Sequence, residues 1–286
     1  MTLMNQGLIA FKAIANTGTV HAAADLLGLT QTAVTQRLKG LEGDLGLTLF
    51  LRSRKGMSLT ADGSALLQYC RSTEELEGIF LSRVTGAARS EIALTIVGPT
   101  SAISTRIVGD CKNLYAKYPH LRIHLRSDDH ANRVDLVRRG EADLGIAHPD
   151  LVPKEMDSKV LKPDRYLLVA CAQWKGRKLQ DILENERIID FYENDQTTKN
   201  YLGKFNLASE MKRERIFVNQ NQALIQLFSN GVGYGTLTET VAAPHLASGE
   251  LCLLNRGQAM EDPLALIWYP RTQKPDYFAH LLRSIK

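Results

Sequence analysis

The fold is decided by residues 22–38, which read AAADLLGLTQTAVTQRL. The small and apolar first half predicts a helix over 20–27, which Gly28 ends because glycine readily adopts the left-handed conformation found at helix C-termini. We expect Leu29 to be buried in the turn. Thr30 offers a hydroxyl that can cap a second helix, predicted over 31–45. The stretch therefore predicts two helices joined by a tight turn.

The second of these helices has two unlike faces. Its apolar face is expected to pack on a core and carries Ala33, Val34, Leu38, Leu41 and Leu45. Its polar face carries Thr32, Thr35, Gln36, Arg37 and Lys39. Amide and hydroxyl side chains can contact base edges, and cationic ones can contact guanine or phosphate. The pair is typical of a helix-turn-helix whose second helix enters the major groove, with an ordinary amphipathic helix pair as the alternative.

The flanking residues complete this small domain. Residues 3–16 predict a first helix, and two short β-type runs at 47–51 and 56–60 enclose Arg52, Ser53, Arg54 and Lys55. This pattern predicts a hairpin, or wing, with a cationic tip. Between residues 31 and 60 there are five basic and two acidic side chains, so +3 of the formal net charge of +4 lies here. Such a concentration favours an anionic partner.

A long proline-free pattern follows at 61–88, with one apolar stripe that includes Leu76 and Phe80. A helix of this kind usually pairs with another helix, so we predict dimerisation here, because two copies can then read two half-sites. A solvent-spanning linker is the alternative.

After residue 90, strands and helices alternate, which predicts parallel β-α-β units. Helical patterns cover 101–118 and 133–139. Strands are expected at 92–97, 121–126, 142–147, 166–170, 187–191, 216–219, 233–237, 251–254 and 264–268. With 286 residues, the chain is long enough for two domains. The predicted fold class is therefore α/β, preceded by an all-α winged helix-turn-helix.

Several classes of protein are disfavoured by composition and motifs. Four scattered cysteines without a Cys-x-x-Cys pair argue against a disulfide framework or a zinc site. No signal sequence and no long apolar run are present, so we expect a cytoplasmic protein without a membrane partner. No nucleophile elbow appears, and the glycines around Tyr234 lack the acidic residue of a dinucleotide site. We therefore predict no enzyme, no catalytic residue and no cofactor.

A metal site is also disfavoured. His120, His124 and His130 lie close together in the sequence, but no further ligand joins them at a known spacing. We predict that the chain has no metal ligands.

Many residues of the first ninety resemble the signature of LysR-type transcription regulators. The matching segments are 22–27, 30–38, Leu41-Glu42, Leu45-Gly46, Leu49-Phe50, Arg52, Arg54 and 59–63. The resemblance implies a DNA-contacting set made of Thr30, Gln31, Thr32, Thr35, Gln36, Arg37, Lys39, Arg52, Arg54 and Lys55. Most family members have proline where this chain has Thr32, so the contact to DNA can differ there.

The resemblance continues more weakly into the α/β part, through 136–146 and 231–235. Family members carry there a two-lobed effector domain similar to periplasmic solute-binding proteins. By this analogy, residues 1–60 bind DNA, 61–90 form the linker helix and 91–286 form the effector domain. Lobe one is then 91–160 with 256–286, and lobe two is 161–255. The resemblance further implies a homodimer or homotetramer, and contact with RNA polymerase if the protein activates transcription.

Four segments resemble most closely the branch that controls export of arginine and lysine: 33–38, Asp129 ahead of 138–141, 219–227 and 245–251. We therefore predict a basic amino acid as the small-molecule effector, bound between the lobes, with a neutral or acidic metabolite as the alternative. A solute-binding or transport component would share the α/β fold but would need export and would lack the helix-turn-helix.

Three pairs of residues are candidates for effector binding. Thr100 and Ser101 stand at a helix start, which favours a carboxylate, although they can equally serve as caps. Asp128 and Asp129 follow a strand and can pair with a cationic group, or can be solvated surface acids. Asn219 and Gln220 also lie between a strand and a helix, where ligand contact and capping are alternatives.

Overall fold

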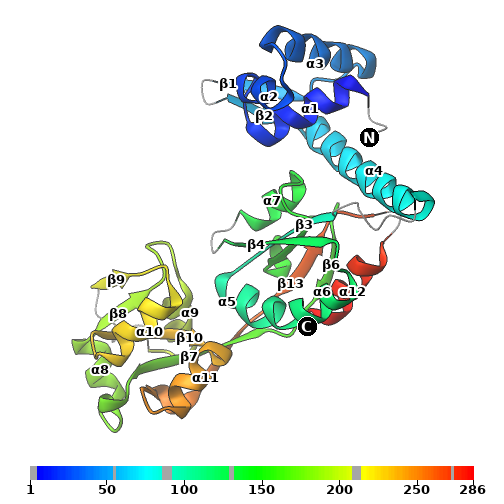
Figure 1. Cartoon of the computed structure of the whole chain (residues 1–286). Coiled ribbons are helices and arrows are strands. Elements are labelled where there is room, and N and C mark those ends of the chain that lie inside the picture. Colours follow the sequence, from blue (N-terminus) through cyan, green and yellow to red (C-terminus); the bar gives the residue numbers. More distant parts are fainter. Residues whose placement is uncertain (1–4, 54–55, 86–91, 129–131, 208–213, 272–273) are drawn as a thin grey trace. The chain divides into compact units, whose positions relative to one another are not determined.

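The computed structural model describes residues 5–53, 56–85, 92–128, 132–207, 214–271 and 274–286. The chain forms two compact units. The first contains residues 1–159 and 265–286, and the second is Val160–Leu264. The order of elements is an N-terminal helical domain with a wing, a long helix and a two-part α/β region (Figure 1). The predicted fold class is confirmed.

The N-terminal domain is built from three capped helices: α1 (Gln6–Thr17), α2 (Val20–Leu27) and α3 (Gln31–Leu45). Each begins at a polar residue whose side chain accepts a backbone N–H: Asn5, Thr19 and Thr30. Each ends at a glycine in the left-handed conformation. The turn between α2 and α3 at Gly28 therefore has the predicted geometry.

The wing consists of the antiparallel strands β1 (Phe50–Ser53) and β2 (Gly56–Leu59). The first strand begins three residues later than predicted, because residues 47–49 form an irregular segment that is bonded to other elements. Glu42 of α3 accepts a hydrogen bond from Leu49 N at 2.8 Å, and the Thr60 hydroxyl donates to Thr48 O at 2.7 Å. The sequence predicted the hairpin but not these two anchors.

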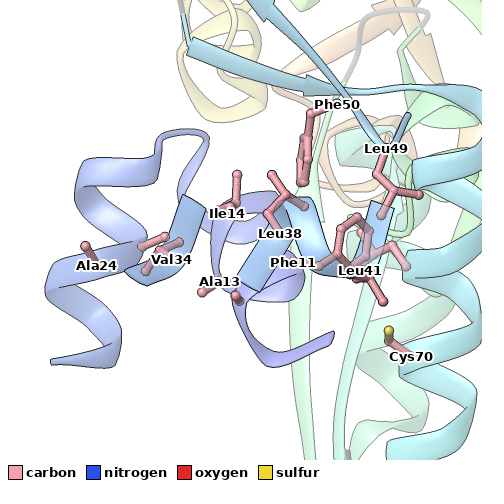
Figure 2. Packing of buried hydrophobic residues seen from close by; sticks show 13 residues of the cluster. Phe11, Ala13, Ile14, Ala24, Val34, Leu38, Leu41, Leu49, Phe50 and Cys70 are labelled. Atoms are coloured by element: carbon pink, nitrogen blue, oxygen red, sulfur yellow. The ribbon is translucent and has the colours of Figure 1, made fainter. Parts of the chain in front are cut away.

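One apolar core joins the three helices, the wing and the first half of α4 (Ala61–Thr85) (Figure 2). Phe11 and Phe50 pack ring against ring, with 5.3 Å between centroids. Leu67 and Cys70 of α4 are fully buried in the same core. Leu45 was expected to join them, but it is 44% exposed because it lies in the last turn of α3, beyond the reach of the core.

The first unit also contains a five-stranded sheet of order β4-β3-β5-β13-β6. Its strands are β3 (Ile92–Gly98), β4 (Leu121–Ser127), β5 (Leu144–Ala147), β6 (Asp157–Val160) and β13 (Ala265–Trp268). Strand β3 is parallel to β4 and β5, and β13 is antiparallel to β5. Short helices accompany the sheet: α5 (Thr100–Ala102), α6 (Cys111–Lys117), α7 (Arg133–Arg138) and α12 (Asp276–Ser284).

The helix predicted over 101–118 is interrupted. A π-helical turn at Ile103–Ile107 and a 3₁₀ turn at Val108–Asp110 separate α5 from α6. Ile103 and Ile107 are both buried, whereas the adjacent Val108 is half-exposed. The spacing of apolar residues predicts a helical segment, but it does not distinguish these three hydrogen-bond patterns.

The second unit has a six-stranded sheet of order β11-β7-β10-β8-β9, with β12 also paired to β7. Its strands are β7 (Asp164–Cys171), β8 (Arg187–Asp190), β9 (Arg215–Phe217), β10 (Gly233–Thr238), β11 (Leu251–Leu253) and β12 (Ala259–Asp262). Its helices are α8 (Leu179–Asn185), α9 (Thr197–Lys204), α10 (Asn221–Ser229) and α11 (Glu239–Ala247).

The chain returns to the first unit at Ala265, later than the boundary predicted at residue 256. The reason is strand β12, which the sequence reading missed. It pairs antiparallel with β7, for example through Glu261 and Arg165, and so holds residues 259–262 in the second unit.

Candidate nucleic-acid interface and effector site

Helix α3 presents a polar face opposite its buried residues. Thr32, Gln36 and Lys39 are exposed, and Thr35 and Arg37 are partly exposed. Val34 and Leu38 on the other side are at most 1% exposed, so the helix is anchored by its apolar face. The exposed amide, hydroxyl and ammonium groups are free of the core. They are the side chains that can read base edges or bind phosphate.

The start of α3 has two structural contacts. Thr30 caps the helix by accepting Ala33 N at 3.2 Å. Gln31 contacts Nδ1 of His21 on α2 at 3.1 Å. The sequence reading did not single out His21, since a lone histidine on a helix gives no spacing signal. Gln31 thus links the two helices of the motif, in addition to its predicted contact with DNA.

The wing is fixed against the turn between α1 and α2. Met57 N donates to Gly18 O at 2.8 Å, and a Cβ on Gly56 would lie 2.6 Å from the same oxygen. Arg52 on β1 is exposed. Arg54 and Lys55, the other predicted cations of the wing, lie outside the described residues. The described part of the hairpin therefore holds Arg52 at a defined place relative to the helices.

The second half of α4 carries exposed apolar side chains. Leu76 is 50% exposed and Phe80 is 55% exposed. The first half of the same helix buries Leu67 and Cys70 in the N-terminal core. The apolar stripe predicted from the sequence thus divides into an anchoring half and a half that presents apolar surface.

Thr100, Ser101 and Asp128 lie at the carboxyl edge of β3 and β4. The two strands are parallel and in register through Gly98 and Ser127, and Asp128 N donates to Gly98 O at 2.9 Å. The cap of the helix after β3 is Pro99, whose side chain makes no capping hydrogen bond, so the alternative that Thr100 or Ser101 is the N-cap is wrong. Both residues instead form the first helical turn, where backbone N–H groups favour an anion. Asp129 lies outside the described residues.

Asn219 and Gln220 belong to the second unit. They follow β9 and precede α10, and both are exposed. Gln220 occupies the N-cap position of α10 but makes no side-chain capping hydrogen bond. Its amide is therefore not committed to the helix end.

A buried polar cluster at the carboxyl end of β8 was missed by the sequence reading. Asp190 accepts hydrogen bonds from Arg215 Nη2 at 2.5 Å and Nε at 2.7 Å, and their side chains are 1% and 11% exposed. Burial raises the pKa of Asp190, since desolvation outweighs hydrogen bonds from Thr198 and Arg215. Thr198 also bonds to Thr236 at 3.0 Å. The sequence feature that could have indicated this cluster is an acidic residue, Asp190, directly after the apolar pair Ile188-Ile189.

Three of the four cysteines do not have the environment of nucleophiles. Cys70 is buried in the N-terminal core, and burial raises the pKa of its thiol to about 11. Burial likewise raises the pKa of Cys111 and Cys252. A neutral thiol is a poor nucleophile and a poor metal ligand. Among the described residues, no three His, Cys, Asp or Glu side chains gather as a metal site.

A winged helix-turn-helix joined to an α/β ligand-binding region defines a DNA-binding regulator with an effector domain. Residues 6–64 match the model of the bacterial regulatory helix-turn-helix protein, lysR family, and residues 89–286 match the LysR substrate binding domain. The chain therefore belongs to the LysR family of transcription regulators. Its members are regulators rather than enzymes, as predicted.

One curated relative and two solved structures are similar to this chain. The chain is 27% identical over 277 residues to the uncharacterized HTH-type transcriptional regulator YcaN of Escherichia coli, covering 92% of this chain and 88% of YcaN. Its fold is similar to ArgP from Mycobacterium tuberculosis, with a TM-score of 0.79 and 24% identity over 99% of this chain and 96% of ArgP. It is also similar to LysG from Corynebacterium glutamicum with bound effector Arg, with a TM-score of 0.76 and 23% identity over 99% and 96% of the two chains.

None of the helices in the described part of the chain combines the length and apolar character needed to cross a membrane.

Proposed function

We propose that this LysR-family regulator is controlled by lysine or arginine and acts on DNA in the cytoplasm. Asn219 and Gln220 are proposed to supply further polar contacts to the effector. The proposed DNA contacts are those of α3 and the wing: Thr30, Gln31, Thr32, Thr35, Gln36, Arg37, Lys39, Arg52, Arg54 and Lys55.

The main support for the proposed effector is the set of polar groups at the carboxyl ends of β3 and β4. A helix start at Thr100 and Ser101 suits an α-carboxylate, and Asp128, directly after the neighbouring strand β4, suits an ammonium or guanidinium group. A basic amino acid carries both kinds of group. The fold-level similarity to LysG with bound Arg supports the same ligand class.

Lysine or arginine should raise the melting temperature of the full-length protein. At 100 times its dissociation constant, a ligand that binds only the folded state adds about 2.7 kcal/mol of stability, which a thermal-shift titration detects. Norleucine is the matched control ligand, because it has the same carbon chain as lysine but lacks the terminal amine, and it should give a much smaller shift.

Protein variants separate this proposal from a neutral or acidic effector. Asp128→Asn and Asp129→Asn, made singly, should show which of the two carboxylates the ligand needs, because removal of that carboxylate should reduce the shift caused by lysine. If a neutral or acidic metabolite stabilises the protein and neither basic amino acid does, the effector proposal is wrong and the family assignment stands.

Gln36→Ala should cost about 1–3 kcal/mol of binding at one base pair of the operator and relax specificity there. The reason is that Gln36 is exposed on the polar face of α3, where its amide can bond a base edge. Binding to a panel of single-base operator variants, measured by fluorescence anisotropy, gives the position. An equal loss on every variant would contradict base reading.

Arg52→Ala is the contrasting variant for that measurement. A wing cation that binds phosphate contributes to all sequences alike, so its removal should lower the salt slope of log Kobs by about 0.9 while leaving the base preference intact.

Helix α4 is proposed to pair with the same helix of a second copy. Leu76→Glu combined with Phe80→Glu should place charges on the exposed apolar half of α4 and reduce the solution mass seen by light scattering. Leu151→Glu is the control, because Leu151 is equally exposed but lies in the short helical turn at Pro149–Leu151. An unchanged mass in the double variant would remove α4 from the dimer interface.

A further inference from the structure

The first unit contains a cavity of about 340 Å³ that has no role in the function proposed above. Residues of α1, of α4 and of the β3 sheet line it. On the sheet side, the lining includes Thr95 in the middle of β3 and Asp143 just before β5. The cavity thus lies beside the middle of β3, whereas Thr100 and Ser101 follow the carboxyl end of that strand.

Five charged side chains line this cavity, and four of them are paired with each other. Lys12 of α1 forms an ion pair with Glu74 of α4. Arg271 Nη2 forms an ion pair with Asp143 Oδ1 at 3.1 Å, and both side chains are about 15% exposed. The fifth is Arg71 of α4, so the lining carries one positive charge in excess.

Arg71 lacks an acceptor of its own within the described residues, where no hydrogen bond or ion pair to its guanidinium is found. Asp143 attracts it electrostatically, but each oxygen of Asp143 already accepts another group: Oδ1 accepts Arg271, and Oδ2 accepts Thr95 N at 2.8 Å. Glu141 also attracts it, yet lies near Arg126 at 3.8 Å. Burial lowers the pKa of Arg71. A desolvated guanidinium with unused donors is unfavourable unless an acceptor arrives.

We propose that this cavity binds a compact oxyanion, a carboxylate or a phosphate, through the guanidinium of Arg71. The planar fork of arginine matches two oxygens of such a group, and the volume admits only a small molecule. The positive excess of the lining selects an anion over a cation. The ligand differs from the proposed basic effector both in charge and in the residues that bind it.

The oxyanion acts on the contact between α4 and the sheet region. Gln68, one turn before Arg71, donates from Nε2 to Val137 O at 3.0 Å. Gly140 lies close to both side chains, because a Cβ on it would be 2.9 Å from Gln68 Nε2 and 3.4 Å from Arg71 Cζ. An anion on Arg71 neutralises its charge at this contact and so strengthens the attachment of the DNA-binding helices to the sheet.

The test is a thermal-shift titration of the full-length protein with sodium phosphate, and separately with sodium acetate, at constant ionic strength set by chloride. The wild type should be stabilised by one of the two anions beyond chloride, which also identifies whether phosphate or carboxylate is the ligand. Arg71→Gln should lose this shift. Lys112→Gln, which removes an exposed cation of α6 outside the cavity, should keep it.

Arg71→Lys is the second variant, since it keeps the charge and so guards against a folding defect of Arg71→Gln. It should bind the anion about tenfold more weakly, which corresponds to one lost hydrogen bond to a charged group, because the ammonium cannot form the paired hydrogen bonds of a guanidinium. The proposal is overturned if neither anion stabilises the wild type beyond chloride, or if both Arg71 variants respond as the wild type does. If Asp128→Asn loses the thermal shift caused by lysine or arginine, the shift caused by the oxyanion should remain. The two sites are therefore tested independently.

Discussion

Arg215→Met should lower the free energy of unfolding by about 3–5 kcal/mol, the cost of leaving a buried charge without its partner. The variant leaves Asp190 without its cationic partner. The side chain of Asp190 is 1% exposed, and its carboxylate accepts two hydrogen bonds from Arg215. Urea unfolding followed by Trp174 fluorescence, in a Trp268→Phe background, reports on the second unit alone, because the chain has two tryptophans.

The matched control is a second ion pair, whose arginine lies on the same strand, β8, as Asp190. Arg187 pairs with Glu214 at 3.2 Å, but both side chains are more than half exposed. Arg187→Met should therefore cost no more than about 1 kcal/mol. The double variant Asp190→Leu with Arg215→Met should recover much of the lost stability, since it removes both charges. Equal losses for Arg215→Met and Arg187→Met would contradict the assigned burial.

The loss in Arg215→Met should also depend on pH. Burial already raises the pKa of Asp190, and removal of the arginine takes away an attraction that opposes this rise. The folded state then keeps a proton that the unfolded chain releases near its ordinary pKa of about 4, so stability falls as the pH rises above that value. The difference between variant and wild type should therefore be smaller near about pH 4 than near about pH 7.

Gly63→Ala should destabilise the N-terminal domain by about 3 kcal/mol, the upper end of the usual cost of overpacking. A Cβ at this position would lie 2.1 Å from the backbone oxygen of Leu49, which cannot move without shifting the entry to the wing. Thermal melting followed by far-UV circular dichroism gives the stability, and operator binding should fall with it.

Gly43→Ala is the control for this substitution. It too is a helical glycine, but nothing lies within 4 Å of the position its Cβ would take. This variant should be unchanged or stabilised by up to about 1 kcal/mol, because alanine favours the helix over glycine. If both alanine variants behaved alike, the close approach of Gly63 to Leu49 would not be the reason for glycine there.

The sequence predicted those features that depend on residues near one another in the chain. The caps at Thr30 and Gly28 form as expected, because both act on their own helix ends. The polar and apolar faces of α3 follow from helical spacing, and only Leu45 in its last turn deviates. In the α/β part, the same reasoning placed the nine expected strands, but it missed β6 and β12.

Features that join distant segments were not predictable from spacing. The pairing of Asp190 with Arg215 requires β8 and β9 to be neighbours, and the position of β12 depends on its register with β7. The setting of Arg71 is a further example, since its surroundings come from three separate parts of the chain.

Helix α4 limits how this regulator can be recombined with others. Its first turns supply Leu67 and Cys70 to the DNA-binding core, while Gln68 and Arg71 of the same turns face Val137 and the cavity. A chimera joined at residue 60 would take Leu67 and Cys70 from one parent and the rest of the DNA-binding core from the other. One inserted residue would rotate each face by about 100°. Hybrid regulators therefore need the junction beyond Arg71, with the residues that meet α4 from the sheet side carried along.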